Sequence, residues 1–177
     1  MQALIPTYIS LRSELNEAEQ QGILAAERWA FNTPHKDFLS EKLLRELHRR
    51  MFKDVWRWAG QYRTTARNIG VDAWQIPPRI KLLLDDTRFW VEQHTYSPDE
   101  TAVRFHHRLV FIHPFPNGNG RHARLMADLF IVQLQGYRFT WGRANLTTVS
   151  ETRKLYIQAL QAADRGDIMP LLNFARS

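Results

Sequence analysis

The chain has 177 residues, 44% of them hydrophobic and 24% charged, which is the composition of an ordinary globular protein and fits a single domain over residues 1–177. It contains no cysteine, which excludes disulfide scaffolds, thiolate zinc sites and cysteine nucleophiles and fits a cytoplasmic location. The 24 Lys and Arg residues outnumber the 18 Asp and Glu residues, and the resulting charge of +6 suits an anionic ligand such as a nucleotide or a nucleic acid.

Two helices are expected in the first third of the chain. Residues 10–31 carry apolar side chains at steps of three and four, which predicts an amphipathic helix within the N-terminal segment 1–32. A second apolar stripe starts at Ser40 and continues to Gly60. Because the sequence shows neither a signal peptide nor a run of about 18 apolar residues, we expect no export and no membrane span.

Residues 61–77 change character. Threonine pairs, Asn68 and Gly70 replace the helical period, which predicts a short β-hairpin that could act as a flap. Two prolines end this segment, and helical spacing returns over residues 80–91.

Four more helices are expected in the second half of the chain. Residues 97–112 begin with a serine cap, a proline and two acids, which is typical of a helix start. Residues 119–134 are apolar nearly all round, as in a buried central helix. Closing helices are expected over residues 150–163 and 168–175, so the fold is predicted to be mainly α with one small β element.

Residues 113–124, HPFPNGNGRHAR, are the most informative run of the chain. A neutral His113, with an ordinary pKa of ~6.5, can take a proton from an attacking hydroxyl near neutral pH. Glycines allow backbone amides to approach phosphate oxygens closely, and the start of the next helix adds partial positive charge. Arg121 and Arg124 share a helix face, which makes sense with an anion between them. The run therefore predicts a polyphosphate site beside a general base.

Each residue of this run also has a plain structural interpretation. His113 can cap a helix, Asn117 can start a turn, and the arginines can pair with acids such as Asp128. Phe115 is expected to point inward and hold the shape of the loop. The functional interpretation depends on all of these residue types occurring together.

The run resembles the signature of the Fic family, the Fic/Doc-type transferases, written HxFx(D/E)GNGRxxR. The positions in register are His113, Phe115, Gly118, Asn119, Gly120, Arg121 and Arg124. WAGQYRTT at 58–65 and YIQALQAADRGD at 156–167 extend the resemblance over essentially the whole chain, and the N-terminal SELNEAEQ is similar to the subgroup called mobile mystery protein B. The resemblance implies a Fic-type helical bundle around a buried central helix, with a short β-hairpin flap.

The resemblance also implies an activity, the transfer of AMP from ATP to a Ser, Thr or Tyr hydroxyl of a target protein. His113 would deprotonate the hydroxyl. Amides at residues 118–120, together with Asn119, would hold the α- and β-phosphates. Arg121 would neutralise phosphate charge, and Arg124 would take the γ-phosphate.

The flap would bind the target protein. Its residues Asn68, Ile69, Gly70 and Val71 would pin a target segment by strand addition, which depends on backbone more than on side chains. Tyr156 would lie beside the adenine, although a core tyrosine is its plainer interpretation.

One specified position departs from the signature, because Asn117 stands where the family has Asp or Glu. The family's carboxylate holds Mg²⁺, and an amide oxygen carries no charge, so metal affinity should fall. We expect ATP binding with weakly bound Mg²⁺ and slow or lost transfer.

Regulation by the first helix is a further implication. Many Fic proteins carry an inhibitory helix with a Ser or Thr four residues before a Glu that pairs with the second motif arginine. Ser13 and Glu17 have that spacing, while Glu14 and Glu19 compete for the role. The alternatives are an antitoxin-like partner or a simply solvated acidic face.

Other functions remain open. Transfer of another phosphate-containing group fits the same family, but phosphorylation is disfavoured because Doc kinases typically have Lys where Gly120 stands. Asn117 also fits a nucleotide-binding protein with weak or no catalysis. Nucleic-acid binding is suggested by the basic residues of the second helix, but the acids and leucines between them fit an exposed helical face. These basic residues are Arg45, His48, Arg49, Arg50, Lys53 and Arg57.

Overall fold

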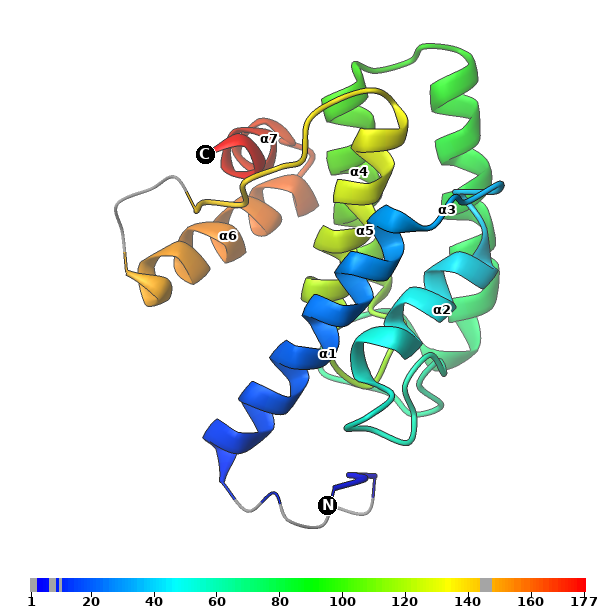
Figure 1. Ribbon diagram of the computed structural model, residues 1–177. Helices are drawn as coiled ribbons and strands as arrows, with labels where there is room; N and C mark the ends of the chain where they lie inside the picture. Colours follow the sequence, from blue (N-terminus) through cyan, green and yellow to red (C-terminus); the bar gives the residue numbers. More distant parts are fainter. Residues whose placement is uncertain (1–2, 7–8, 10, 144–147) are drawn as a thin grey trace.

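Helices dominate the described part of the chain, which comprises residues 3–6, 9, 11–143 and 148–177 of a computed structural model (Figure 1). They are α1 Arg12–Asn32, α2 Glu41–Phe52, the 3-10 helix η1 Ala73–Gln75, α3 Ile76–Glu92, α4 Pro98–Ile112, α5 Asn119–Gln133, α6 Val149–Asp164 and α7 Met169–Arg176. Within these ranges, one isolated antiparallel bridge between Leu4 and Trp56 is the only β pairing. The expected mainly helical fold is confirmed, while Ser10, the expected helix start, lies outside the described residues.

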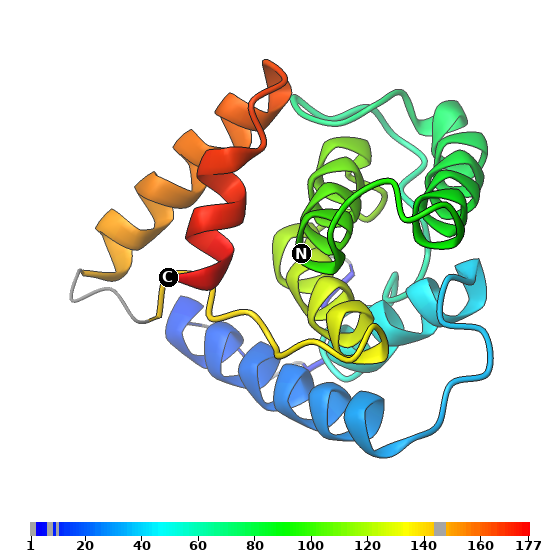
Figure 2. The same ribbon diagram turned by 90° about the horizontal axis from the view of Figure 1, so that it is seen from above.

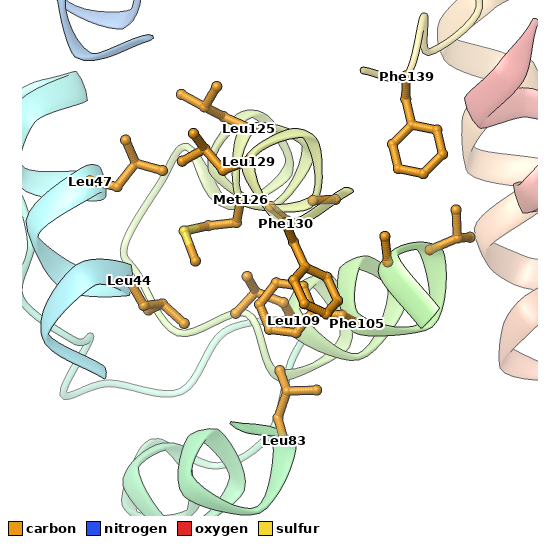
Figure 3. Close-up of a cluster of buried hydrophobic side chains, with 14 of the residues drawn as sticks. Leu44, Leu47, Leu83, Phe105, Leu109, Leu125, Met126, Leu129, Phe130 and Phe139 are labelled. Carbon is orange, nitrogen blue, oxygen red and sulfur yellow. The ribbon is translucent and has the colours of Figure 1, made fainter. Parts of the chain in front are cut away.

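Helix α5 is the centre of the fold. Figure 2 shows it beside α4 in the middle of the molecule, surrounded by α1, α2, α3 and the α6–α7 pair. Its side chains are buried around most of its circumference, as the apolar sequence predicted. The cluster in Figure 3 joins α5 to its neighbours through Leu44, Leu47, Leu83, Phe105, Leu109, Met126, Leu129 and Phe130.

Sequence signals at helix starts explain where several helices begin. The Ser40 hydroxyl accepts the N–H of Leu43 at 3.2 Å and so caps α2, and Ser97 caps α4 through the N–H of Glu100 at 3.3 Å. Helix α3 begins at Ile76, so both prolines lie in its first turn, where a missing N–H loses no helical hydrogen bond. The prolines therefore start this helix rather than separate it from the preceding loop.

The β-hairpin expected over residues 61–77 is wrong. Residues 61–72 contain no strand and form a loop that leads into η1. The Arg63 guanidinium donates to the carbonyl of Thr65 at 3.0 Å and also to that of Val71. These carbonyls are satisfied by a side chain, so the loop does not need a strand ladder.

One other segment differs in extent from the expectation, namely the second apolar stripe over residues 40–60. Helix α2 ends at Phe52, and residues 53–60 form turns. The segment leading to Trp141 lies along α7, where the N–H groups of Thr140 and Trp141 donate to the Ala175 carbonyl at 2.9 and 3.0 Å. None of the helices in the described ranges is both long and apolar enough to cross a bilayer.

Candidate active site

His113 stands at the junction of α4 and the loop that leads into α5. Its N–H donates to the Leu109 carbonyl at 3.2 Å, and its backbone is left-handed, with φ of 55°. Burial lowers the pKa of the half-buried imidazole, and the charges of Arg63 and then Arg67 lower it further. The ring is therefore neutral at physiological pH and able to accept a proton.

The interior of the loop is filled by Phe115, as the sequence predicted. Its fully buried ring stacks on His48 with 3.6 Å between ring centroids. The side-chain amide of Asn119 donates to the Phe115 carbonyl at 2.8 Å and accepts the Phe115 N–H at 2.9 Å. Because both ends of the Asn119 amide hold the loop, the group that this residue offers to a phosphate is its backbone N–H.

His48 supports the same loop, although the sequence suggested only a basic helical face. Its Nδ1 accepts the N–H of Gly60 at 2.9 Å, so its Nε2 carries the proton and donates to the Asn117 carbonyl at 3.0 Å. Burial lowers the pKa of His48 well below its ordinary value and keeps this tautomer neutral. The signal in the sequence was its place among the leucines of α2, since the buried face there includes Leu44 and Leu47.

The two glycines at the start of α5 have different roles. Gly118 has φ of 78°, and a Cβ there would lie 2.4 Å from Cζ of Phe52, so the turn requires glycine. Gly120 is helical, and its Cβ would lie 3.7 Å from Nη1 of Arg124 and 3.9 Å from the Tyr156 hydroxyl. Gly120 therefore leaves the first-turn N–H groups of α5 open to an anion beside Arg124.

Arg121 is held by an acid of α1. Its Nη1 lies 2.7 Å from Oε2 of Glu19, and the indole N–H of Trp56 donates to Oε1 of the same carboxylate at 2.7 Å. Glu19 is only 4% exposed, whereas Ser13 and Glu17 are both exposed. The acid that reaches a motif arginine is therefore Glu19, although the sequence favoured Glu17, and it pairs with the first motif arginine instead of the expected second, Arg124.

Arg124, one turn further along α5, contacts α6 instead of α1. Its guanidinium lies over the Tyr156 ring, 5.1 Å from the centroid, and no ion pair to it occurs among the described residues. Tyr156 packs on Phe174 of α7, and its hydroxyl lies 3.0 Å from Nε2 of the buried His106. Tyr156 is thus built into the core while its ring stays beside Arg124 and the start of α5.

The position of the expected metal ligand, Asn117, offers little for binding a metal ion. Asn117 is exposed, and its side-chain oxygen already accepts the N–H of Gly118 at 2.8 Å. The described residues contain no group of three His, Cys, Asp or Glu side chains that could hold a metal ion. The residues present therefore do not make a charged magnesium site by themselves.

The four residues expected to bind a target lie in the loop beside His113. Asn68 and Gly70 are exposed, and the Ile69 side chain is 61% exposed. Val71 is half-buried, and its N–H donates to the Ile112 carbonyl at 3.3 Å. The loop is thus anchored at Val71, and the exposed Ile69 lies next to Gly70, which packs against His113.

The basic residues of the second helix do not form a free cationic face. Arg49 and Arg50 both pair with Glu46 at 2.7 Å, and Arg45 donates to the Gly60 carbonyl at 3.0 Å. Since His48 is fully buried, the groups needed for a nucleic-acid surface are largely engaged within the fold.

Comparison with known sequences gives consistent matches. The sequence profile of the Fic/DOC family matches residues 38–131. The protein adenylyltransferase fic-1 of Caenorhabditis elegans is 32% identical over 133 residues, which cover 73% of this chain and 25% of that protein. The protein adenylyltransferase Fic of Aedes aegypti is 28% identical over 142 residues, which cover 78% of this chain and 27% of that protein. The chain thus spans about a quarter of the length of these curated relatives.

Solved structures show the same arrangement of helices. Fic-1 from Caenorhabditis elegans superposes with a TM-score of 0.72 at 27% identity, covering 98% of this chain and 50% of that chain. The BepC protein of Bartonella tribocorum, a VirB-translocated effector with bound AMPPNP, superposes with a TM-score of 0.73 at 22% identity, covering 98% of this chain and 90% of that chain. The likeness to BepC shows a shared fold.

Proposed function

This chain belongs to the Fic/DOC family, and from that premise we propose that it is a protein adenylyltransferase that moves AMP from ATP to a Ser, Thr or Tyr hydroxyl of a target protein. The observation that carries the proposal is a half-buried, neutral His113 at the end of α4, joined by a short loop to the start of α5, which carries Arg121 and Arg124. The relatives named protein adenylyltransferase and the AMPPNP bound to BepC support it.

In the proposed reaction the target hydroxyl attacks the α-phosphorus of ATP, a P–O bond forms to the target, and the bond to pyrophosphate breaks. Nε2 or Nδ1 of His113 takes the hydroxyl proton as this bond forms. The N–H groups of Asn119 and Gly120, together with that of Gly118 once it exchanges its bond to the Asn117 side chain for one to phosphate, bind the phosphate oxygens, and Arg121 and Arg124 balance their charge. The Tyr156 ring, close to Arg124, is the proposed neighbour of the adenine.

In this proposal Mg²⁺ is bound only weakly, together with the triphosphate. Asn117 offers one neutral oxygen, so the phosphates themselves would supply most of the ligands. We therefore propose slow transfer, and no step assigned to the chain's own residues requires the ion.

We also propose self-inhibition through Glu19. Its carboxylate occupies Arg121, the same cation that is proposed to bind phosphate, so ATP must compete with an internal anion. An antitoxin-like partner is not needed for this restraint, because the Glu19–Arg121 contact lies within the chain. The flap residues Asn68 to Val71 remain the proposed docking segment for the target, now as a loop whose exposed backbone is open to an added strand.

The alternative functions within the family are a nucleotide-binding protein without transfer and an enzyme that moves another phosphate-containing group. Asn117 favours a nucleotide-binding protein without transfer. Gly120, which stands where Doc kinases typically have Lys, disfavours transfer of the γ-phosphate.

One experiment separates these functions. The protein and a cell lysate are incubated with ATP labelled on the α- or on the γ-phosphate, using the wild type, His113→Ala and Glu19→Gln. We expect label from the α-phosphate only, more of it with Glu19→Gln and none with His113→Ala. Label from the γ-phosphate indicates a kinase, and no label in any sample, with ATP binding intact, indicates a binding protein and contradicts the proposal.

A further inference from the structure

Arg63 is a buried arginine whose hydrogen bonds go to backbone carbonyls. The residue is 3% exposed, and its guanidinium donates to the carbonyls of His113 at 2.7 Å, Thr65 at 3.0 Å, Ile112 at 3.3 Å, and also Val71. No carboxylate forms an ion pair with it among the residues that the structure describes. One side chain therefore ties the end of α4 to both ends of the 65–71 loop.

This arrangement is unusual in energetic terms. A buried cation without an acid loses its hydration, and burial lowers the pKa of Arg63, with Arg67 lowering it further and Asp72 raising it. The five donors of a guanidinium lie in a planar fork that can reach several carbonyls at once, which the ammonium of a lysine cannot do. A fold that needed only a filled core would place an apolar side chain here.

The carbonyls that Arg63 binds flank a strained position. His113 has a left-handed backbone, which is costly for a residue with a Cβ, and the carbonyls of Ile112 and His113 lie on its two sides. The backbone N–H of Arg63 adds a bond to the Pro114 carbonyl at 2.9 Å. Arg63 thus donates to all three consecutive carbonyls of residues 112–114, and the Val71 N–H adds a bond to the Ile112 carbonyl at 3.3 Å.

The loop is pressed against the same point. Gly70 has φ of 93°, and a Cβ at this position would lie 2.6 Å from Cβ of His113 and 2.7 Å from Nη2 of Arg63. The loop that carries the proposed docking residues therefore contacts the base directly, with the Arg63 guanidinium alongside.

We propose that Arg63 is a positioning residue for the transfer reaction, because its guanidinium fixes the left-handed backbone of His113 and fastens the 65–71 loop to it as one rigid unit. The inference rests on the proposed function and deepens it. The base and the docking segment then keep a fixed separation, which is what attack by a bound hydroxyl needs.

The charge of Arg63 has a second consequence. After burial, Arg63 is the next largest cause of the lowered pKa of His113, followed in the same direction by Arg67, while the Val110 carbonyl opposes them. A general base must be unprotonated, so transfer declines as the pH falls through the pKa of His113. Removing the positive charge of Arg63 should raise the pH at which the transfer rate declines. Replacing its planar guanidinium by another cation should leave that pH unchanged.

Two substitutions separate the fork from the charge. Arg63→Lys keeps the charge and loses the fork, and Arg63→Gln loses both. Arg88→Lys is the matched control, because the Arg88 guanidinium also donates to a backbone carbonyl, that of Leu39 at 2.5 Å, but lies between α3 and the chain before α2. We expect kcat to fall roughly tenfold to a hundredfold in Arg63→Lys. The pH of half-maximal rate should be unchanged in Arg63→Lys and higher in Arg63→Gln, and Arg88→Lys should match the wild type.

Two measurements do not require transfer. The imidazole pKa of His113, followed by NMR titration, should rise in Arg63→Gln only, and amide hydrogen exchange at Val71 should speed up in both Arg63 variants but not in Arg88→Lys. A folded Arg63→Lys protein with wild-type kcat and wild-type exchange at Val71 overturns the inference. If the wild type transfers nothing, the proposed function fails while the titration and the exchange still decide the role of Arg63.

Discussion

At the scale of single residues, the two glycines of the motif make opposite predictions. Gly118→Ala places a methyl group 2.4 Å from the buried ring of Phe52 and keeps φ positive, so it should destabilise the fold by about 3 kcal/mol. Gly120→Ala adds a methyl group at ordinary contact distance and should change the free energy of unfolding by less than about 1 kcal/mol. Urea unfolding followed by circular dichroism measures both.

Although Gly120→Ala should change stability little, it should weaken the binding of the nucleotide. The methyl group of Gly120→Ala would lie beside Arg124 and the Tyr156 hydroxyl at the start of α5, and it should weaken ATP binding about tenfold, or 1.4 kcal/mol. Titration calorimetry with ATP tests this. A Gly120→Ala protein that binds ATP as tightly as the wild type would remove the start of α5 from the proposed phosphate site.

Asn117 is the residue at which the chain departs from its family, and restoring the acid tests the role of charge. Asn117→Asp keeps an oxygen that accepts the Gly118 N–H and adds a negative charge. We expect ATP affinity to rise about tenfold when Mg²⁺ is present and to fall when it is chelated, because the new carboxylate attracts the ion and repels the free triphosphate. Asn117→Ala, which removes the oxygen, is the control. Equal affinities with and without Mg²⁺ in Asn117→Asp would show that charge at this position is irrelevant.

At the scale of elements, the contact between α1 and α5 is the one most open to test. Glu19→Gln keeps an oxygen for the indole N–H of Trp56 but removes the charge that holds Arg121. ATP affinity and the rate of α-phosphate transfer should both rise, roughly fivefold to thirtyfold, because an internal competitor of 1–2 kcal/mol is lost.

Glu17→Gln is the matched control on the same helix, because Glu17 is exposed and forms no ion pair among the described residues. It should leave both quantities unchanged. If Glu17→Gln activates as much as Glu19→Gln, the effect belongs to the acidity of the helix and not to the Glu19–Arg121 contact.

The helices were predictable from the sequence because their signals are local. Apolar spacing, the serine caps at Ser40 and Ser97 and the all-round apolar pattern of α5 each depend on residues a few positions apart. The loop over residues 61–72 was not predictable from the sequence. Its shape depends on hydrogen bonds from Arg63 to the carbonyls of Ile112 and His113 at the end of α4, which are 49 and 50 residues further along the chain. A contact over that separation leaves no period in the sequence.

The site shows the same division. The run from His113 to Arg124 could be proposed as a site from the sequence because its residues are contiguous. Glu19 was left as one of three acids, since pairing with Arg121 depends on how α1 crosses the start of α5. His48 was taken for a surface cation because composition cannot show that its ring stacks on Phe115. These contacts could not be predicted from the sequence, because tertiary packing decides which of several residues of one type forms the contact.

At the scale of the whole molecule, three buried histidines link its elements. His48 of α2 reaches the Asn117 carbonyl, His106 of α4 reaches the Tyr156 hydroxyl of α6, and His122 of α5 donates to the Leu44 carbonyl of α2 at 2.8 Å. All three are 0% exposed. Burial lowers the pKa of His106 to about 3 and that of His122 to about 4, and it lowers the pKa of His48 well below 6.5.

The protein should therefore lose stability as the pH falls below about 6.5, where histidines of the unfolded chain bind protons that these buried rings do not. Each group contributes a slope of about 1.4 kcal/mol per pH unit, so three give about 4, against a total stability of about 5–15 kcal/mol. Unfolding is expected between about pH 5 and 3. Urea unfolding at a series of pH values measures the slope.

A substitution at one of these rings should change the slope by a known fraction. His122→Gln keeps a donor for the Leu44 carbonyl but cannot titrate, so it should reduce the slope by about one third. His94→Asn, at an exposed position with a left-handed backbone that asparagine tolerates, should not change it. An unaltered slope in His122→Gln would mean that acid unfolding starts elsewhere. A reduced slope would show that the buried, neutral His122 ring contributes to acid unfolding.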